Sequence, residues 1–501
     1  MVSLPTFSFR RIAAAFLLIL TAGCQGPASS DRTHEWVGTL PRRDTGFDRR
    51  TWQDTSVTTV NQLMERLPDR IDSAAEHRLA RNLLISITDA PQGDNGSSEL
   101  LALRVEALMR IGNAGDAAAL ARAARTPPRD EASARREAEA ELLAGNIEMG
   151  CIDLRALAAR SSTRWVEDGV ALCRVRAGEP GVAAPTGTSG LGALARISGA
   201  PLPAEPSSSD PAVTIAYRAA VGGDPKAPGS ARLDAAFAAA RASALGGDAY
   251  AKILRSAHVQ GALAEGPPAT GGQAAALFRA IEGTGDPGRK LALAERGLLS
   301  PDGTVDGVSA AMAEALRGVK PGAGPFAAGF AAYFYAVGDA KAAIPWSDLA
   351  KRSGSDSAVW PYRALVKPPG EAEFAQWQKR AHLDPARQER IAAILSAFGV
   401  GAGSASEPSQ DGLREIDRSA ALQHVGETTL RALTILGTGG PAAASPQALH
   451  HVLAALDRVN LHDEARAIAC EAIAAVLVSR PTPHKGEVAA SNKAAGTPSD
   501  L

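Results

Sequence analysis

Apolar residues recur at helical spacing along most of the chain. Between residues 73 and 88, Leu79, Leu83, Leu84 and Ile87 fall on one face of a helix, and the charged residues fall on the others. Alanine, which has the highest helix propensity, is abundant, and runs of β-branched residues are scarce. The pattern therefore predicts an all-α protein.

A unit of two helices joined by a short turn recurs. The turns contain Gly or Asn, which end a helix in the left-handed conformation, and most also carry Asp or Glu, which suits the positive start of the next helix. The predicted pairs are Leu101–Ile111 with Ala117–Ala124, Ala138–Ala144 with Ile147–Ala159, Phe330–Val337 with Lys341–Ala350, and Val452–Val459 with Ala465–Val476.

These hairpins resemble tetratricopeptide repeats, most closely at Ala332–Arg352 (AYFYAVGDAKAAIPWSDLAKR). The resemblance implies an irregular α-solenoid of stacked helical hairpins with a concave surface that holds a partner protein. The complete repeat signature and a regular period are missing. The alternative is an irregular stack of antiparallel helices with no true repeat.

Composition divides the chain into regions. Residues 179–232 are rich in Gly, Pro and Ser, which predicts a linker between helical-hairpin regions at 57–178 and 233–478. The polar, arginine-rich residues 24–56 show no helical or strand period. They are interpreted as a tether or as a loosely packed lead-in, with Trp36 and Trp52 placed against the first helices. Residues 479–501 lack an apolar stripe, and we expect a disordered tail.

Residues 1–23 have the parts of a secretory signal peptide. Two arginines at positions 10 and 11 precede the apolar run Ile12–Leu20, which is too short to span a bilayer permanently, and small residues follow it. Thr21-Ala22-Gly23-Cys24 resembles the lipobox of bacterial lipoproteins, which implies cleavage before Cys24 and attachment of lipid to it. An ordinary cleaved signal with an incidental Cys24 is the alternative.

The residue after Cys24 bears on the compartment. Gln25 stands where Asp would mark retention in the inner membrane under the lipoprotein sorting rule, so the resemblance implies lipid anchoring to the periplasmic face of the outer membrane. The basic and acidic residues are interspersed and give a net charge of −1, which argues against a nucleic-acid partner. No cofactor is predicted.

Two of the four cysteines are placed to form a disulfide. Cys151 and Cys173 are equally far from residue 162, and residues 161–163 form a natural turn between two predicted helices. Positions equidistant from the turn of an antiparallel hairpin lie side by side, and an exported chain meets oxidising conditions. Cys470 is interpreted as a buried apolar residue, with an intermolecular disulfide as the alternative.

No catalytic or metal motif emerges from the chain. It contains no G-x-S-x-G, S-x-x-K, HExxH or paired CxxC sequence. The nearest metal-like group joins His450 and His451 to residues 462–464, but a helix length separates the two sets. We therefore predict neither a metal site nor an enzyme.

Two carboxylate pairs are interpreted as solvated helix faces. Glu137 and Glu141 are spaced by four residues among other charges, and Glu464 and Glu471 lie two helical turns apart.

Aromatic residues gather between Phe326 and Trp377, where ten of them occur. Several fall at the spacing of one buried helix face, which indicates a well-packed core. The alternative is a groove that contacts a peptide or glycan, with Tyr335 and Trp360 as its test residues.

Two functions are consistent with these patterns. The first is a lipid-anchored periplasmic scaffold or adaptor that binds an envelope protein. The second is an envelope protein that binds or processes glycan, such as peptidoglycan or exopolysaccharide, through the aromatic region.

Overall fold

The computed structural model describes residues 35–478, apart from residues 37, 129 and 246 and the segments 94–97, 125–127, 183–228, 242–244, 258–262, 264–266, 299–305, 317–318, 320–326 and 402–409. The described residues are mostly helical, with almost no strands, so the all-α prediction is confirmed. Most of the predicted linker and the whole predicted tail lie outside the described residues.

The first described elements pack onto the helices instead of forming a tether. The strand β1 (Glu35–Trp36) pairs antiparallel with β2 (Thr88–Asp89), with Trp36 opposite Thr88. The short helices α1 (Arg42–Thr45) and η1 (Arg49–Trp52) follow. Phe47 and Trp52 are buried, so from about residue 38 onward the structure agrees with a packed lead-in and not with a tether.

The N-terminal helices follow in sequence and pack largely against their neighbours in the chain. They are α2 (Val57–Glu65), α3 (Ala74–Ile85), α4 (Ser98–Arg110), α5 (Ala114–Ala124), α6 (Glu131–Leu143), α7 (Ile147–Ala158) and α8 (Arg164–Arg176).

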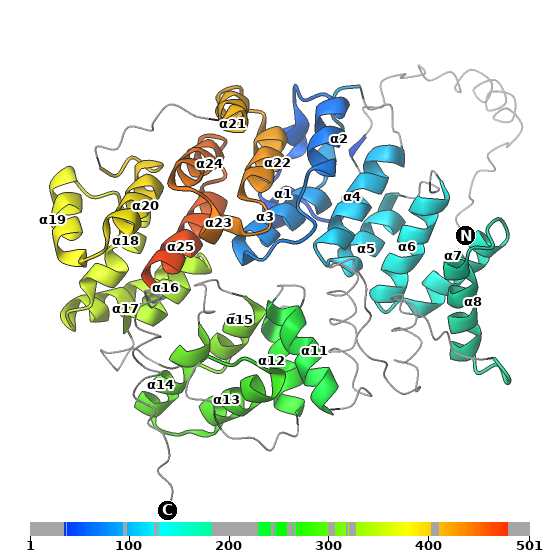
Figure 1. The fold of residues 1–501 in the computed structure, drawn as a ribbon, viewed down its shortest axis with the longest axis horizontal. Helices are drawn as coiled ribbons and strands as arrows, with labels where there is room; N and C mark the ends of the chain where they lie inside the picture. The colour runs from blue at the N-terminus through cyan, green and yellow to red at the C-terminus, as the bar shows by residue number, and fades with distance from the viewer. Residues whose placement is uncertain are drawn as a thin grey trace, which may run out of the picture.

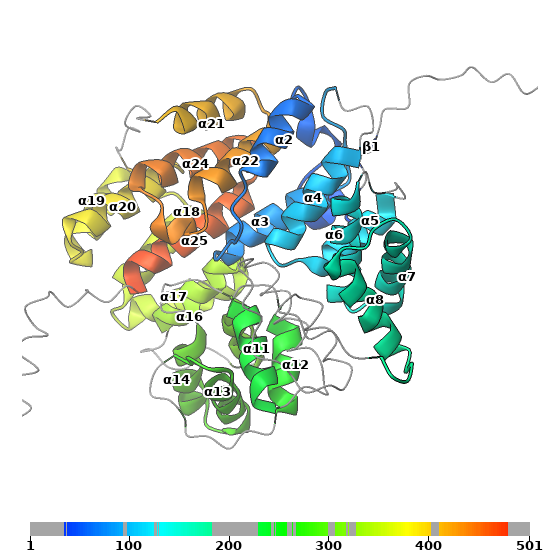
Figure 2. The same cartoon turned by 45° about the vertical axis from the view of Figure 1, so that its right-hand side comes forward.

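The next five helices pack together into a lobe. They are α11 (Gly229–Arg241), α12 (Gly247–Ser256), α13 (Gly271–Gly283), α14 (Pro287–Leu298) and α15 (Gly307–Glu314). Figure 1 and Figure 2 both show this lobe, in green, below the remaining helices. Its main contact with them is made by α14 against α16.

The last helices form the part of the molecule drawn from yellow-green to red in Figure 1. They are α16 (Ala327–Ala336), α17 (Ala340–Arg352), α18 (Asp356–Val366), α19 (Glu371–Ala381), α20 (Pro385–Ser396), α21 (Asp411–Ala421), α22 (Val425–Leu436), α23 (Gly440–Ala443), α24 (Pro446–Arg458) and α25 (His462–Val478).

The predicted turns have the predicted backbone. Gly112, Gly145, Gly338 and Asn460 all have positive φ, between 65° and 85°. After each one, an N–H bonds back to a carbonyl five residues earlier in the preceding helix, as from Leu461 to Leu456 at 3.0 Å. These turns therefore stop one helix and start the next at all four predicted hairpins.

Helix α25 is central to the packing. It contacts α3, α16, α18, α20, α23 and α24, and its residues from 467 to 476 are all buried. A helix that is apolar on all sides belongs inside a protein. We call α3, α22 and α25 the hub, because α3 contacts both of the other two and so joins the two ends of the described chain (Figure 2).

This packing changes the predicted division into regions. The region 233–478 is not one unit, because its second half, α16–α25, packs onto α2 and α3, whereas α11–α15 stand apart as the lobe. Trp52 shows how closely the two ends of the chain pack. If Gly426 of α22 carried a Cβ atom, that atom would lie only 2.4 Å from the ring of Trp52. Hydrophobic spacing along a helix gives its buried face but not the helix that covers it, so the sequence did not reveal this pairing.

Candidate functional site

The predicted lipidation site lies outside the described residues, as does the whole signal segment 1–23. Within the described part of the chain, none of the helices combines the length and the apolar character that crossing a bilayer requires. The structure therefore leaves lipid attachment at Cys24 as a prediction.

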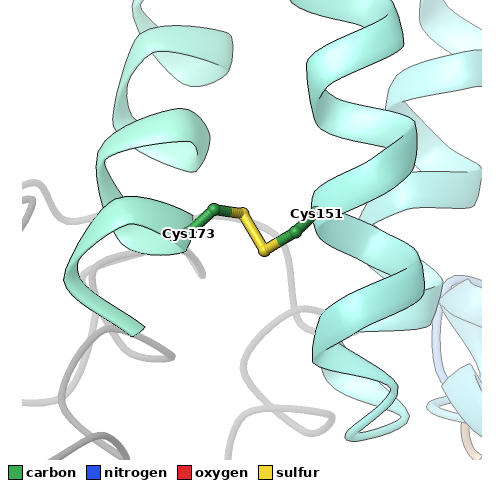
Figure 3. Close-up of a disulfide and its surroundings, with 2 residues drawn as sticks. All are labelled: Cys151 and Cys173. Carbon is green, nitrogen blue, oxygen red and sulfur yellow. A yellow bond between two sulfur atoms is a disulfide. The ribbon is translucent and has the colours of Figure 1, made fainter. Parts of the chain in front are cut away.

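The predicted disulfide is present. The sulfur atoms of Cys151 and Cys173 lie at bonding distance, and the two Cα atoms are 5.6 Å apart (Figure 3). The bond joins α7 to α8 across a hairpin. Gly169 of α8 lets the two helices approach closely, because a Cβ there would lie 2.7 Å from a methyl group of Leu154.

The aromatic region is core, so Tyr335 and Trp360 do not form a binding surface. Each is 5% exposed. Tyr335 stacks on Tyr362 with ring centroids 5.9 Å apart, and Trp360 stacks on Trp377 at 5.2 Å. Tyr335 lies off the main apolar stripe of α16. Because α16 is apolar around most of its circumference, Tyr335 is buried as well.

The prediction that Glu471 lies on a solvated face is also wrong. Glu471 is 2% exposed and accepts hydrogen bonds from the Ser73 hydroxyl at 2.5 Å and the Ala75 N–H at 2.8 Å. Ser73 is the N-cap of α3, so a carboxylate from α25 completes the N-terminus of α3, where negative charge is favoured. This contact joins residues 398 positions apart.

Glu76 is a second carboxyl group at this junction. It is fully buried, and neither of its carboxyl oxygens has a hydrogen-bond partner in the part of the chain that the structure describes. Burial, followed by the neighbouring Glu471 and then Asp72, raises the pKa of Glu76 well above its ordinary value. The site therefore favours a neutral carboxyl group. Cys470, beside Glu471 on α25, is buried as predicted.

The pair Glu137 and Glu141 is only partly solvated. Glu141 is 3% exposed, forms an ion pair with Arg122, and accepts a hydrogen bond from the Asn146 amide at 2.8 Å. Burial, with Asp153 and Glu141 as the nearby negative charges, raises the pKa of Glu137 to about 7. These groups tie α5, α6 and the start of α7 together.

His450 and His451 do not form a catalytic relay with their described neighbours. His451 Nδ1 lies 2.8 Å from Asp417, whereas His450 Nδ1 lies 2.8 Å from the Ser396 hydroxyl. A serine–histidine–carboxylate relay needs one imidazole to bridge both partners, and here two rings divide them. His462 instead pairs with Asp457 at 2.7 Å, and no metal-binding group occurs among the described residues.

An open groove of 620 Å³ lies on α13 and α14. Its apolar lining comes from Leu263, Ala280, Ala292 and Leu293, and the C-terminal end of α13 closes one side with Gly283 and Thr284. Its volume is in the range of pockets that bind small ligands or side chains of a partner. We call this the α13–α14 groove.

Two guanidinium groups give the groove its charge. Arg289 and Arg296 both line it, seven residues apart on α14 and therefore on the same face of the helix. Arg289 is exposed and Arg296 is half-buried. No carboxylate is among the residues that line the groove.

Three described carboxylates lie close to the groove in sequence. Glu282 accepts a hydrogen bond from Arg255 Nε at 2.8 Å. Asp286 accepts the N–H groups of Gly288 and Arg289 at the start of α14. Glu295, on α14, is exposed. The described lining of the groove therefore combines apolar side chains with two arginines.

Sequence reasoning missed this groove. Within α14, residues 289, 292, 293 and 296 have the spacing of a single stripe, which the sequence shows. The contribution of Leu263 and of the end of α13 follows only from tertiary packing.

Comparison with protein-family models, with curated proteins and with solved structures finds no significant match for this chain. The groove, the disulfide and the packing of the helices therefore carry the functional argument.

Proposed function

We propose that the chain is a lipid-anchored scaffold or adaptor of the bacterial cell envelope that binds a partner protein in the α13–α14 groove. Cys24 carries the lipid, and the folded part faces the periplasm from the outer membrane. The helices form an irregular α-solenoid of stacked hairpins, similar to tetratricopeptide arrays. The groove is the observation that carries this proposal, because it offers an accessible, partly apolar surface on a helical array.

The disulfide supports the location. Disulfides persist in exported proteins and are rare where thiols are kept reduced. Cys151 and Cys173 lie at disulfide-bonding distance across the hairpin of α7 and α8. This agrees with the signal-like sequence that precedes Cys24.

The position of the aromatic residues favours a protein partner over a glycan. The glycan-binding alternative needs Tyr335 and Trp360 on an accessible surface, and both side chains are buried in the core. Aromatic side chains are absent from the lining of the α13–α14 groove. Arginine, which is enriched at protein–protein interfaces, lines the groove at two positions.

Photo-crosslinking in living cells tests this function. A benzoylphenylalanine residue replaces Thr284, which lines the groove, and in a control protein it replaces Lys351, which is exposed on α17. Each version is made with Cys24 and with Cys24→Ser, and labelling with a lipid analogue reports acylation.

The proposal predicts lipid labelling that depends on Cys24, and a discrete protein adduct from position 284 that weakens in the Cys24→Ser form. The same adducts from positions 284 and 351 would contradict a role for the groove. Absence of lipid labelling in the Cys24 form would contradict the anchor.

A further inference from the structure

We infer that the exposed face of α7 is a self-association surface, on which a second copy of the chain lays its own α7 antiparallel. This inference goes beyond the proposed function, because it concerns the N-terminal helices and not the α13–α14 groove. It follows from the apolar side chains on this face, from the charges that flank them, and from the two-fold symmetry that two copies of one surface can adopt.

An apolar stripe runs along the exposed face of α7. Met149, Ile152, Ala156 and Ala159 are all exposed, the first two by 42% and 54%. Their spacing of three, four and three residues is that of a coiled-coil seam. The buried Leu154, which packs on α8, points to the opposite side of the helix. Figure 1 and Figure 2 both show α7 and α8 at an edge of the molecule, where a second helix can reach this stripe.

The two halves of the stripe are complementary in size. The N-terminal half carries Met149 and Ile152, whereas the C-terminal half carries Ala156 and Ala159. When two copies of the stripe lie antiparallel, Met149 of one copy faces Ala159 of the other, and Ile152 faces Ala156. Each large side chain then enters the space beside a small one, which is how close-packed interiors are filled. Parallel copies would instead set the large side chains against each other.

The charges beside the stripe favour the same orientation. Glu148 and Arg155 flank it on one side, and Asp153 and Arg160 flank it on the other. In the antiparallel arrangement, Glu148 of each copy lies opposite Arg155 of the other, and Asp153 lies opposite Arg160. Two-fold symmetry repeats both pairs of opposite charge. In a parallel arrangement, Glu148 would meet Asp153 and Arg155 would meet Arg160, which like-charge repulsion disfavours.

The surroundings of Asp153 make a positive charge from a second copy favourable. Asp153 is half-buried, and burial followed by the neighbouring Glu141 raises its pKa. Burial, then Asp153 and then Glu141, raise the pKa of Glu137 to about 7. These shifts are present although Arg122 already pairs with Glu141. Arg160 of a second copy brings a further guanidinium group to this acidic cluster, which offsets the repulsion among its carboxylates.

Sedimentation velocity of charge variants tests the inference on the full chain with Cys24→Ser, so that lipid does not drive association. Glu148→Arg turns the contacts between Glu148 and Arg155 of the two copies into contacts between arginines. Adding Arg155→Glu to the same chain restores opposite charges, whereas adding Arg160→Glu does not. Both double variants keep the composition and net charge of the wild type, so each is the control for the other. All three altered side chains are exposed, so we expect circular dichroism to show unchanged folding.

We expect the wild-type protein to dimerise reversibly and weakly, since one pair of helices buries less surface than a permanent dimer does. Glu148→Arg should raise the Kd at least tenfold, and Arg155→Glu in the same chain should bring it back. Ile152→Gln should also weaken the dimer. Ile344→Gln changes a similarly exposed isoleucine on α17 and should leave the dimer unchanged.

A protein that stays monomeric at every concentration would overturn the inference. So would a dimer that Glu148→Arg strengthens, because that is the result for parallel helices, or one that Arg160→Glu restores in place of Arg155→Glu. Equal weakening by Ile152→Gln and Ile344→Gln would contradict the assignment of the surface to α7. The crosslink from position 284 reports on the lobe, so the proposed function is tested separately from this dimer.

Discussion

The hub and the lobe of α11–α15 are held together in different ways. In the hub, Glu471 of α25 bonds to Ser73 and Ala75 at the start of α3, so that a few contacts join sequence positions 398 apart. The lobe is built from helices close in sequence, and it reaches the rest of the molecule mainly where α14 meets α16.

This difference separates stability from recognition. A defect in the hub disturbs both ends of the chain at once, because α25 contacts helices from both. A defect in the lobe leaves most contacts of the hub in place, and the lobe also carries the α13–α14 groove. Regions with fewer contacts to the rest of a protein open at lower free energy.

The largest expected effect comes from a cavity in the hub. Ile473→Ala on α25 removes a fully buried side chain, which should lower the free energy of unfolding by about 2–5 kcal/mol. Hydrogen exchange should quicken in α3 as well as in α25. The matched variant Ile281→Ala removes an equally buried side chain from α13, and its effect should stay in the lobe; a loss spread over the whole protein would contradict the comparison.

The disulfide should have the next largest effect, confined to α7 and α8. Replacing both Cys151 and Cys173 by Ser opens a loop with a sequence separation of 22 and should destabilise this hairpin by about 3 kcal/mol. Limited proteolysis should then cut α8 while α25 stays intact. Unchanged cleavage of α8 in the double variant would contradict a clamping role.

A smaller and pH-dependent effect is expected at Glu76. Burial beside Glu471 raises the pKa of Glu76, so the folded state keeps a proton that the unfolded state releases at the ordinary glutamate pKa. The stability from this proton is full below the ordinary pKa and is lost as the pH rises toward the raised value.

Glu76→Gln keeps the site neutral, so its Tm should rise relative to that of the wild type between pH 5 and pH 8. Glu99→Gln on α4 is a control, since Glu99 is exposed. A Tm difference that stays constant with pH would contradict a protonated Glu76.

The smallest effect on stability belongs to the groove. Arg289→Ala removes an exposed side chain and should change the free energy of unfolding by less than about 0.5 kcal/mol. The same variant should weaken the adduct from benzoylphenylalanine at position 284, because Arg289 lines the groove. A loss of stability in urea titration as large as that of Ile281→Ala would show that recognition is not separate from folding.

Much of the fold could be predicted from local sequence signals. Gly112, Gly145, Gly338 and Asn460 end helices by a backbone conformation that the residue type itself favours, so the four hairpins were placed correctly. The Cys151–Cys173 pair followed from the symmetry of one hairpin. Each of these signals acts over about twenty residues or fewer.

The parts that were missed depend on contacts between distant segments. Glu471 was expected on a solvated face with Glu464, but the N-terminus of α3 makes a buried position favourable for it. Trp52 was expected against the first helices, whereas Gly426 of the distant helix α22 lies against it. The groove likewise needs Leu263 to lie beside α14, which no spacing along the chain indicates.

The most direct test of the account is native-state hydrogen exchange of the wild-type protein. The account predicts that the amides of α3 and α25 open at a higher free energy than those of α13 and α14. Equal opening free energies in the hub and in the lobe would contradict the separation of a stabilising hub from a lobe that carries the α13–α14 groove.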